Sequence, residues 1–147
     1  MMRAIYVPVR FKGARNEVVR RSLIDTGAEI SLVPIDLARQ VGAWCTNQTI
    51  GITGIHGHSR IVPLVKMGIF FPKLSGKGGY FLIAVGDTNE PLIGIDVLRL
   101  LGIEIDTRTG KLEVKNEIWE AFKTLSAVGV ILFTGIKVLE KVFGEET

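Results

Sequence analysis

The chain has 147 residues, of which 47% are hydrophobic and 22% are charged, and its formal net charge is +3. This composition excludes a disordered chain, and the length allows one domain with a modest core plus an appendage. The 17 glycines are spread between short apolar runs, which favours an all-β class.

Basic residues crowd the first 21 positions, where the only acidic residue is Glu17; they are Arg3, Arg10, Lys12, Arg15, Arg20 and Arg21. A nucleic-acid site would interleave such residues with aromatic residues or glycines, and this segment does not. We therefore expect a solvated strand face and no nucleic-acid partner.

Cys45 is the only cysteine, so no disulfide can form within the chain, and a reducing, cytoplasmic location is expected. The residue type favours a small buried hydrophobe at this position over a nucleophile. The N-terminus alternates like a strand and lacks the continuous apolar core of a signal peptide.

The first half of the chain reads as strands and turns. Alternation predicts strands over 3–11, where Pro8 marks an edge, and over 17–24, with a third strand over 30–34. Residues 34–40 then predict a short helical turn that ends near Gly42.

The second predicted strand delivers Asp25 into a turn that Gly27 and Ala28 close. Small residues at these positions let a backbone or a substrate approach the carboxylate closely. Asp-Thr also occurs at 87–88 and 106–107, but there the flanking residues are typical of ordinary turns.

Residues 46–66 predict a long hairpin with a glycine-rich tip over 51–57. A phosphate-binding loop is a poor alternative, because no Gly-Lys-Ser/Thr ending and no helix follow. His56 and His58 suggest a metal site, but a third ligand is missing nearby, so we expect no metal.

The second half predicts a loop over 67–79, a buried strand over 80–85 and a turn over 86–91. The apolar pair Leu92-Ile93 and Gly94 then precede a helix from Asp96 to about Leu101, which Gly102 ends. Residues 103–106 and 111–114 alternate as the strands of a final hairpin.

Three features in this order resemble the retroviral-type aspartic proteases (retropepsins): the Asp25–Ala28 turn, the glycine-tipped hairpin and the Leu92–Gly94 segment before a helix. The resemblance covers about residues 3–115. It implies an all-β, retropepsin-like acid protease barrel with a short helix before the last hairpin, formed by residues 1–115.

The resemblance also implies roles for individual residues. Asp25, Thr26 and Gly27 would form the catalytic turn, with Ile93 and Gly94 packed behind it as structural support. The hairpin would be a flap that folds over bound peptide. The residues implied to contact the substrate are Ala28, Glu29, Ile52, Gly54, Ile55, His56, Gly57, Asn89, Pro91 and Leu92.

Aspartic proteolysis needs two carboxylates, and this chain offers one Asp-Thr-Gly. An active enzyme would therefore be a homodimer that needs no cofactor, and the apolar pockets predict hydrophobic residues around the cleaved bond. A catalytically silent peptide-binding or dimerisation module remains the alternative. In retroviral enzymes a C-terminal strand joins the two subunits, and this chain has no obvious equivalent of that strand. We therefore expect the 103–114 hairpin or the apolar helix after it to form the dimer interface.

Residues 116–147 lie outside the resemblance and predict an apolar helical extension. Their uncharged stretch, from Thr124 to Ile136, is shorter than the about 20 residues that a membrane-spanning helix needs. We expect this helix to pack on its own domain or on a partner subunit. Flanking lysines leave membrane association through residues 118–139 open.

Overall fold

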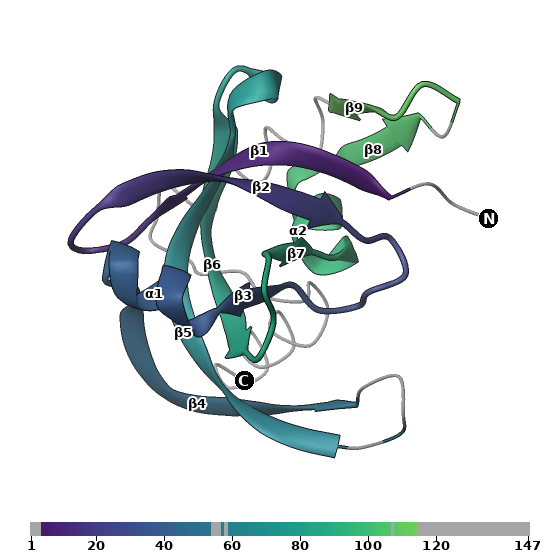
Figure 1. The fold of residues 1–147 in the computed structure, drawn as a ribbon. Coiled ribbons are helices and arrows are strands. Elements are labelled where there is room, and N and C mark those ends of the chain that lie inside the picture. Colours follow the sequence, from purple (N-terminus) through teal and green to yellow (C-terminus); the bar gives the residue numbers. More distant parts are fainter. Residues whose placement is uncertain (1–3, 54–56, 58, 107, 115–147) are drawn as a thin grey trace, which may run out of the picture.

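The computed structural model describes residues 4–53, 57, 59–106 and 108–114. These residues form a mixed sheet, a separate two-stranded hairpin and two short α-helices (Figure 1). The elements are β1 (Ile5–Lys12), β2 (Glu17–Ile24), β3 (Leu32–Pro34), α1 (Ile35–Val41), β4 (Trp44–Thr53), β5 (Ser59–Phe71), a 3-10 turn (Pro72–Leu74), β6 (Lys77–Gly86), β7 (Leu92–Ile93), α2 (Ile95–Leu101), β8 (Ile103–Asp106) and β9 (Lys111–Val114).

The main sheet closes on itself. Its strand order is β1-β2-β7-β3-β6-β5-β4, and β1 also pairs with β5, through Arg10↔Phe70 to Lys12↔Gly68. Only the last residues of β1 have this second neighbour, so Pro8, which has no backbone N–H to donate, lies where the strand pairs with β2 alone. The prediction of an all-β barrel is confirmed.

The core fills the inside of this barrel with side chains that alternate along the strands. Val7, Val9 and Phe11 of β1 are buried, and β5 and β6 bury Met67, Ile69, Phe71, Phe81, Ile83 and Val85 in the same cluster. Burying a side chain of this size contributes about 1.5–3 kcal/mol, so the alternation fixes which face of each strand turns inward.

The prediction of a loop over 67–79 is wrong for most of that range. β5 continues to Phe71 and β6 begins at Lys77, so the glycines of this segment lie within or beside paired strands. A Cβ at Gly78 would clash with the carbonyl oxygen of Ile69. Glycine lets the backbones of the two strands approach closely here. The sequence pattern alone does not distinguish this role from that of glycine in a loop.

Cys45 is exposed, so the prediction of a buried cysteine is also wrong. It belongs to β4, which is the last strand of the sheet and pairs only with β5 there. An edge position leaves its thiol at an open cavity beside α1.

The remaining elements agree closely with the sequence. α1 ends at Gly42 and α2 ends at Gly102, and both glycines adopt the left-handed conformation, with φ of 67° and 68°. α2 is followed by the predicted β8–β9 hairpin, while β3 is shorter than expected.

The extension over 116–147, and with it the boundary between the two predicted domains, lies outside the described residues. The same holds for the 118–139 segment considered for membrane association. No helix within the described ranges is long and apolar enough to cross a membrane.

Candidate active site

Asp25 directly follows β2, and β7 holds the end of that strand. The two strands are parallel, with Leu23↔Leu92 and Ile24↔Ile93 in register. The backbone N–H of Leu23 donates to the Pro91 carbonyl, and that of Asp25 donates to the Ile93 carbonyl, both at 2.9 Å. The start of the turn is therefore fixed to a buried strand.

The turn closes tightly around the Asp25 carboxylate. The N–H of Ala28 donates to the Asp25 carbonyl at 3.1 Å, and the N–H of Gly27 donates to Asp25 Oδ1 at 3.0 Å. A Cβ at Gly27 would come within 3.3 Å of the same Oδ1, so glycine leaves space beside the acid. Asp25 is half-buried and Gly27 is exposed, which leaves the turn open to a ligand.

A buried polar network supports the turn from behind. Ser31 donates to Asp96 through its backbone N–H, at 3.1 Å to Oδ2, and through its hydroxyl, at 2.6 Å to Oδ1. The N–H of Gly94 donates to Ser31 Oγ at 2.8 Å, and the N–H of Ile95 donates to the Ala28 carbonyl at 2.9 Å. The start of α2 is thus joined to both ends of the segment that leaves Asp25.

Gly94 is where these two segments cross most closely. A Cβ there would come within 2.6 Å of the Ala28 carbonyl oxygen and 3.2 Å of Asp96 Oδ1. The crossing therefore requires glycine, and a side chain would push α2 away from the Asp25 turn.

Asp96 is only 5% exposed. Burial raises the pKa of Asp96 above its ordinary value of 3.8, and the hydrogen bonds from Ser31 oppose this shift only in part. The carboxyl faces the inside of the protein, so it acts on the site by positioning the turn.

Sequence reasoning passed over both Ser31 and Asp96. The available signal was an acidic residue within the otherwise apolar start of a short helix, directly after Ile93-Gly94-Ile95. Such a side chain is buried only when it has partners, which points to a structural hydrogen-bond network.

A second hydrophobic cluster links β4 and β5 to the segment after the turn. Val62, Leu64 and Ala84 are its buried members, and the partly buried ones are Ile30, Leu32, Ile50, Ile52 and Leu82. Of the residues predicted to contact substrate, Ile52 belongs to this cluster, and Leu92 lies beside it because it pairs with Leu32. The arrangement offers an apolar wall rather than a charged one.

The other predicted contact residues are less closely joined to the Asp25 turn. Glu29 is exposed beyond the turn, and Pro91 is buried against β2. The carbonyl of Asn89 accepts a hydrogen bond from Arg20 at 3.4 Å. Gly57 is exposed with a φ of 75°, and the rest of the predicted flap tip, Gly54, Ile55 and His56, lies outside the described residues.

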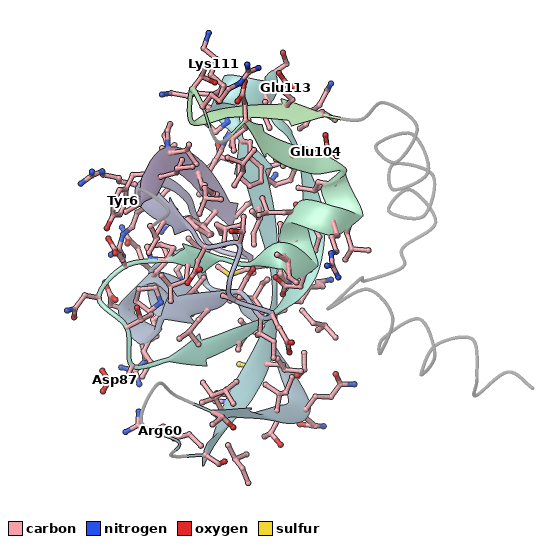
Figure 2. All side chains as sticks on the ribbon, turned by 90° about the vertical axis from the view of Figure 1, so that its right-hand side faces the viewer. Tyr6, Arg60, Asp87, Glu104, Lys111 and Glu113 are labelled. Carbon is pink, nitrogen blue, oxygen red and sulfur yellow. The ribbon has the colours of Figure 1, made fainter. Side chains whose placement is uncertain are left out.

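The β4–β5 and β8–β9 hairpins lie at opposite ends of the described structure. Figure 2 shows Arg60 of β5 and Asp87, which form a 4.0 Å ion pair, at one end, and Glu104, Lys111 and Glu113 of the β8–β9 hairpin at the other. In Figure 1 the end of β2 lies between them, on the same side as the ends of β4 and β8. The Asp25 turn therefore belongs to a face that both hairpins border.

No group of three or more His, Cys, Asp and Glu side chains that could hold a metal ion occurs within the described ranges. His56 and His58, the pair considered in the sequence, lie outside those ranges.

No family model matches the chain, and the comparison with curated proteins gave no match. Solved structures do match. The EIAV protease complexed with the inhibitor HBY-793 aligns with a TM-score of 0.53 and 20% identity, over 71% of this chain and 93% of that one. The retroviral protease-like domain of Ddi1 from Leishmania major aligns with a TM-score of 0.50 and 21% identity, over 78% and 89%. The chain has a retropepsin-like fold, the fold of an aspartic protease or a related domain.

Proposed function

We propose that this protein is a homodimeric aspartic endopeptidase whose active site pairs the Asp25 carboxylates of two copies. The observation that carries the proposal is the local geometry of Asp25. Its carboxylate sits in a glycine-closed turn that β7 and the Ser31–Asp96 network hold in place, within a retropepsin-like fold.

The proposed chemistry follows from bringing two like charges together. Two carboxylates a few ångströms apart cannot both ionise, so the pair shares one proton and holds an acid and a base at once. The base takes a proton from water as that water attacks the peptide carbonyl, and the acid protonates the carbonyl oxygen and then helps the amine leave.

A second copy is needed because this chain contains one Asp-Thr-Gly. Two copies related by a two-fold axis beside the turn would bring their Asp25 residues together, with Thr26 of each at the axis. The β8–β9 hairpin supports such an assembly, because in the described part of the chain β8 and β9 pair only with each other. A hairpin that pairs with no other described strand can be extended by a strand of a partner chain.

The proposed substrates are peptides with hydrophobic residues around the scissile bond. The apolar cluster of Leu32, Ile50 and Ile52, together with Leu92, supports this preference. A flap formed by the β4–β5 hairpin would close over the bound peptide and exclude water from the reaction.

The test is cleavage of an unstructured protein between pH 4 and 7 by the wild type and by Asp25→Asn. The exchange keeps the shape of the side chain and removes the shared proton, so we expect activity to fall by at least about a thousand-fold. Asp87→Asn is the matched control, because Asp87 also precedes a threonine but is 86% exposed and paired only with Arg60 at 4.0 Å. It should keep wild-type activity.

Equal cleavage by Asp25→Asn and wild type would overturn the proposal. A wild type that binds peptide without hydrolysing it, under conditions in which it is folded and dimeric, would instead identify a catalytically silent module.

A further inference from the structure

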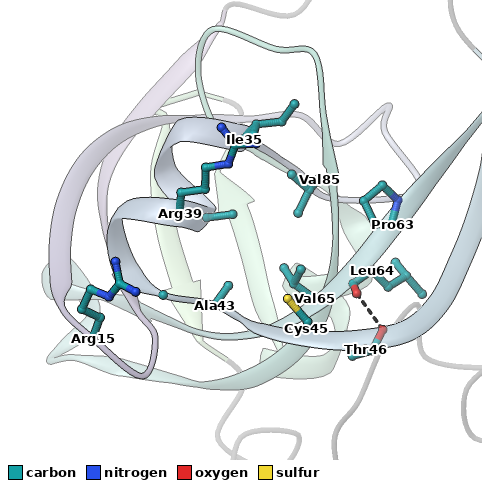
Figure 3. A pocket seen from close by; sticks show the side chains of 12 residues that line it. Arg15, Ile35, Arg39, Ala43, Cys45, Thr46, Pro63, Leu64, Val65 and Val85 are labelled. Carbon is teal, nitrogen blue, oxygen red and sulfur yellow. Dashed lines mark hydrogen bonds between the residues drawn. The ribbon is translucent and has the colours of Figure 1, made fainter.

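A cavity of about 510 Å³ opens between α1, the beginning of β4 and the middle of β5 (Figure 3). Its volume lies within the range of small-molecule sites. Neither the residues of the Asp25 turn nor Ile52 and Leu92 line it. The cavity therefore lies apart from the Asp25 turn, although Leu64 belongs both to its lining and to the second hydrophobic cluster.

The walls of this cavity are apolar. Ile35 and Ala38 line it from α1, the helix between β3 and β4. Val65 of β5 and Val85 of β6 also belong to its lining. Thr46 contributes a hydroxyl, but that group already donates to the Leu64 carbonyl at 2.6 Å and accepts from the Gln48 N–H at 3.1 Å. The β4–β5 side of the cavity therefore suits an apolar group.

Among the described residues, the charged ones that line the cavity are Arg15 and Arg39. They come from the β1–β2 turn and from α1, and hydrogen bonds hold the two segments together. The N–H of Arg15 donates to the Val41 carbonyl at 2.9 Å, and the N–H of Ala14 donates to the Gly42 carbonyl at 2.8 Å. A Cβ on Gly42 would come within 2.8 Å of the Arg15 Cβ, so the turn rests directly on the end of the helix.

Neither guanidinium group has a counter-charge among the described residues. Among the described residues neither has an ion pair or a side-chain hydrogen bond, whereas the nearby Arg20 pairs with Asp36 at 3.2 Å. Two exposed like charges at one apolar cavity, whose described lining contains no acidic residue, leave a positive field there that an anion would complement.

We infer that this cavity binds a small amphipathic anion. Figure 3 shows both arginines on one side of the cavity and Thr46 and Pro63 on the other, with Cys45 between them. The anionic head lies at the arginines, where guanidinium groups donate charge-assisted hydrogen bonds, and the apolar body lies against Val65 and Pro63. The inference does not depend on peptidase activity.

Cys45 provides a local reporter, because it is the only cysteine of the chain, is exposed and lines the cavity. The experiment measures the rate at which neutral iodoacetamide alkylates Cys45 in the full chain, by mass spectrometry. Decanoate is the probe, and 1-decanol is the uncharged control with the same apolar body. We expect saturating decanoate to slow alkylation by about five-fold and decanol at the same concentration to change it by less than about two-fold.

The double variant Arg15→Gln/Arg39→Gln should weaken decanoate binding by about ten-fold, as read from the same protection curve. Arg99→Gln, which removes an exposed charge from α2 instead, should leave the curve unchanged. Arg15→Lys/Arg39→Lys keeps both charges and should retain most of the affinity, so it also controls for folding of the variants.

Several results would overturn the inference. They are no protection by decanoate, equal protection by decanol, and unchanged affinity in the Gln double variant. Loss of Cys45 protection in Arg99→Gln as well would contradict it too, because the effect would then follow net charge rather than this cavity.

Discussion

At the scale of single residues, the Asp25 turn depends on groups that face away from solvent. Ser31 donates twice to Asp96, and Ser31 Oγ in turn accepts from Gly94. Each of these groups is buried, so none can exchange its partner for water. The geometry of the turn is therefore set in the interior, while Asp25 itself is only half-buried.

Asp96→Asn should lower the free energy of unfolding by about 1–3 kcal/mol, because the amide cannot accept both hydrogen bonds from Ser31 and leaves a buried group unsatisfied. Urea unfolding followed by circular dichroism measures the change. Asp36→Asn is the control: Asp36 is 75% exposed in its pair with Arg20, so its loss should cost about 0–1 kcal/mol. Equal effects of the two exchanges would contradict the structural role of Asp96.

The cost of Asp96→Asn should also depend on pH. Because burial raises the pKa of Asp96, the folded protein holds this proton to higher pH than the unfolded chain does. The contribution of Asp96 to stability is then fully present below the unfolded pKa near 3.8 and is lost as the pH rises through the folded pKa. Unfolding curves of both proteins from pH 4 to 7 should show a difference that shrinks with rising pH; a constant difference would disagree.

The sequence predicted the site unevenly at this scale. Asp25, Gly27 and Gly94 stand out because they belong to the motifs that carry the resemblance to retropepsins. Ser31 and Asp96 do not, because their role comes from a contact between residues 65 positions apart. Cys45 was placed in the core because its type is usually buried, and only the edge position of β4 shows otherwise.

At the scale of elements, the alternating strands and both glycine-terminated helices could be read from the sequence, because each pattern is local. The β5–β6 hairpin could not, since its glycines suggested a loop. There the strands pair from Leu64↔Ala84 to Phe71↔Lys77, with Gly68, Gly78 and Gly79 in the ladder. Glycine has the same appearance in sequence whether it frees a backbone or lets two backbones approach.

Gly78→Ala should therefore destabilise the protein by at least about 1–3 kcal/mol, because its Cβ would meet the Ile69 carbonyl and force the two strands apart. Gly51→Ala is the matched control in β4, since the nearest atom to its Cβ would be 4.0 Å away. It should change the free energy of unfolding by less than about 1 kcal/mol. Similar urea midpoints for both variants would show that close strand approach is not what Gly78 provides.

At the scale of the whole molecule, the closure of the barrel is the feature that sequence patterns do not contain. β1 pairs with β5, and β2 and β3 form parallel pairs with β7 and β6, so the pairings join distant segments. Hydrophobic periodicity alone is compatible with many strand arrangements. The resemblance to retropepsins is what indicates a barrel. The matches to solved structures show the same fold, and they leave assembly and catalysis to experiment.

The proposed assembly is an isologous dimer, which the β8–β9 hairpin and the face shared by the Asp25 turn and both hairpins support. In such a dimer each active site belongs to two chains at once. Dimers that contain one wild-type chain and one Asp25→Asn chain therefore test the proposed mechanism more directly than either pure protein does.

The most direct test is the peptidase activity of wild type and Asp25→Asn, unfolded together, refolded as mixtures and assayed at constant total chain concentration. If two Asp25 carboxylates share one site, activity should follow the square of the wild-type fraction, so an equal mixture should keep about one quarter of full activity. Activity that falls in direct proportion to the wild-type fraction, leaving about one half in the equal mixture, would show that each chain works alone and would contradict the paired site.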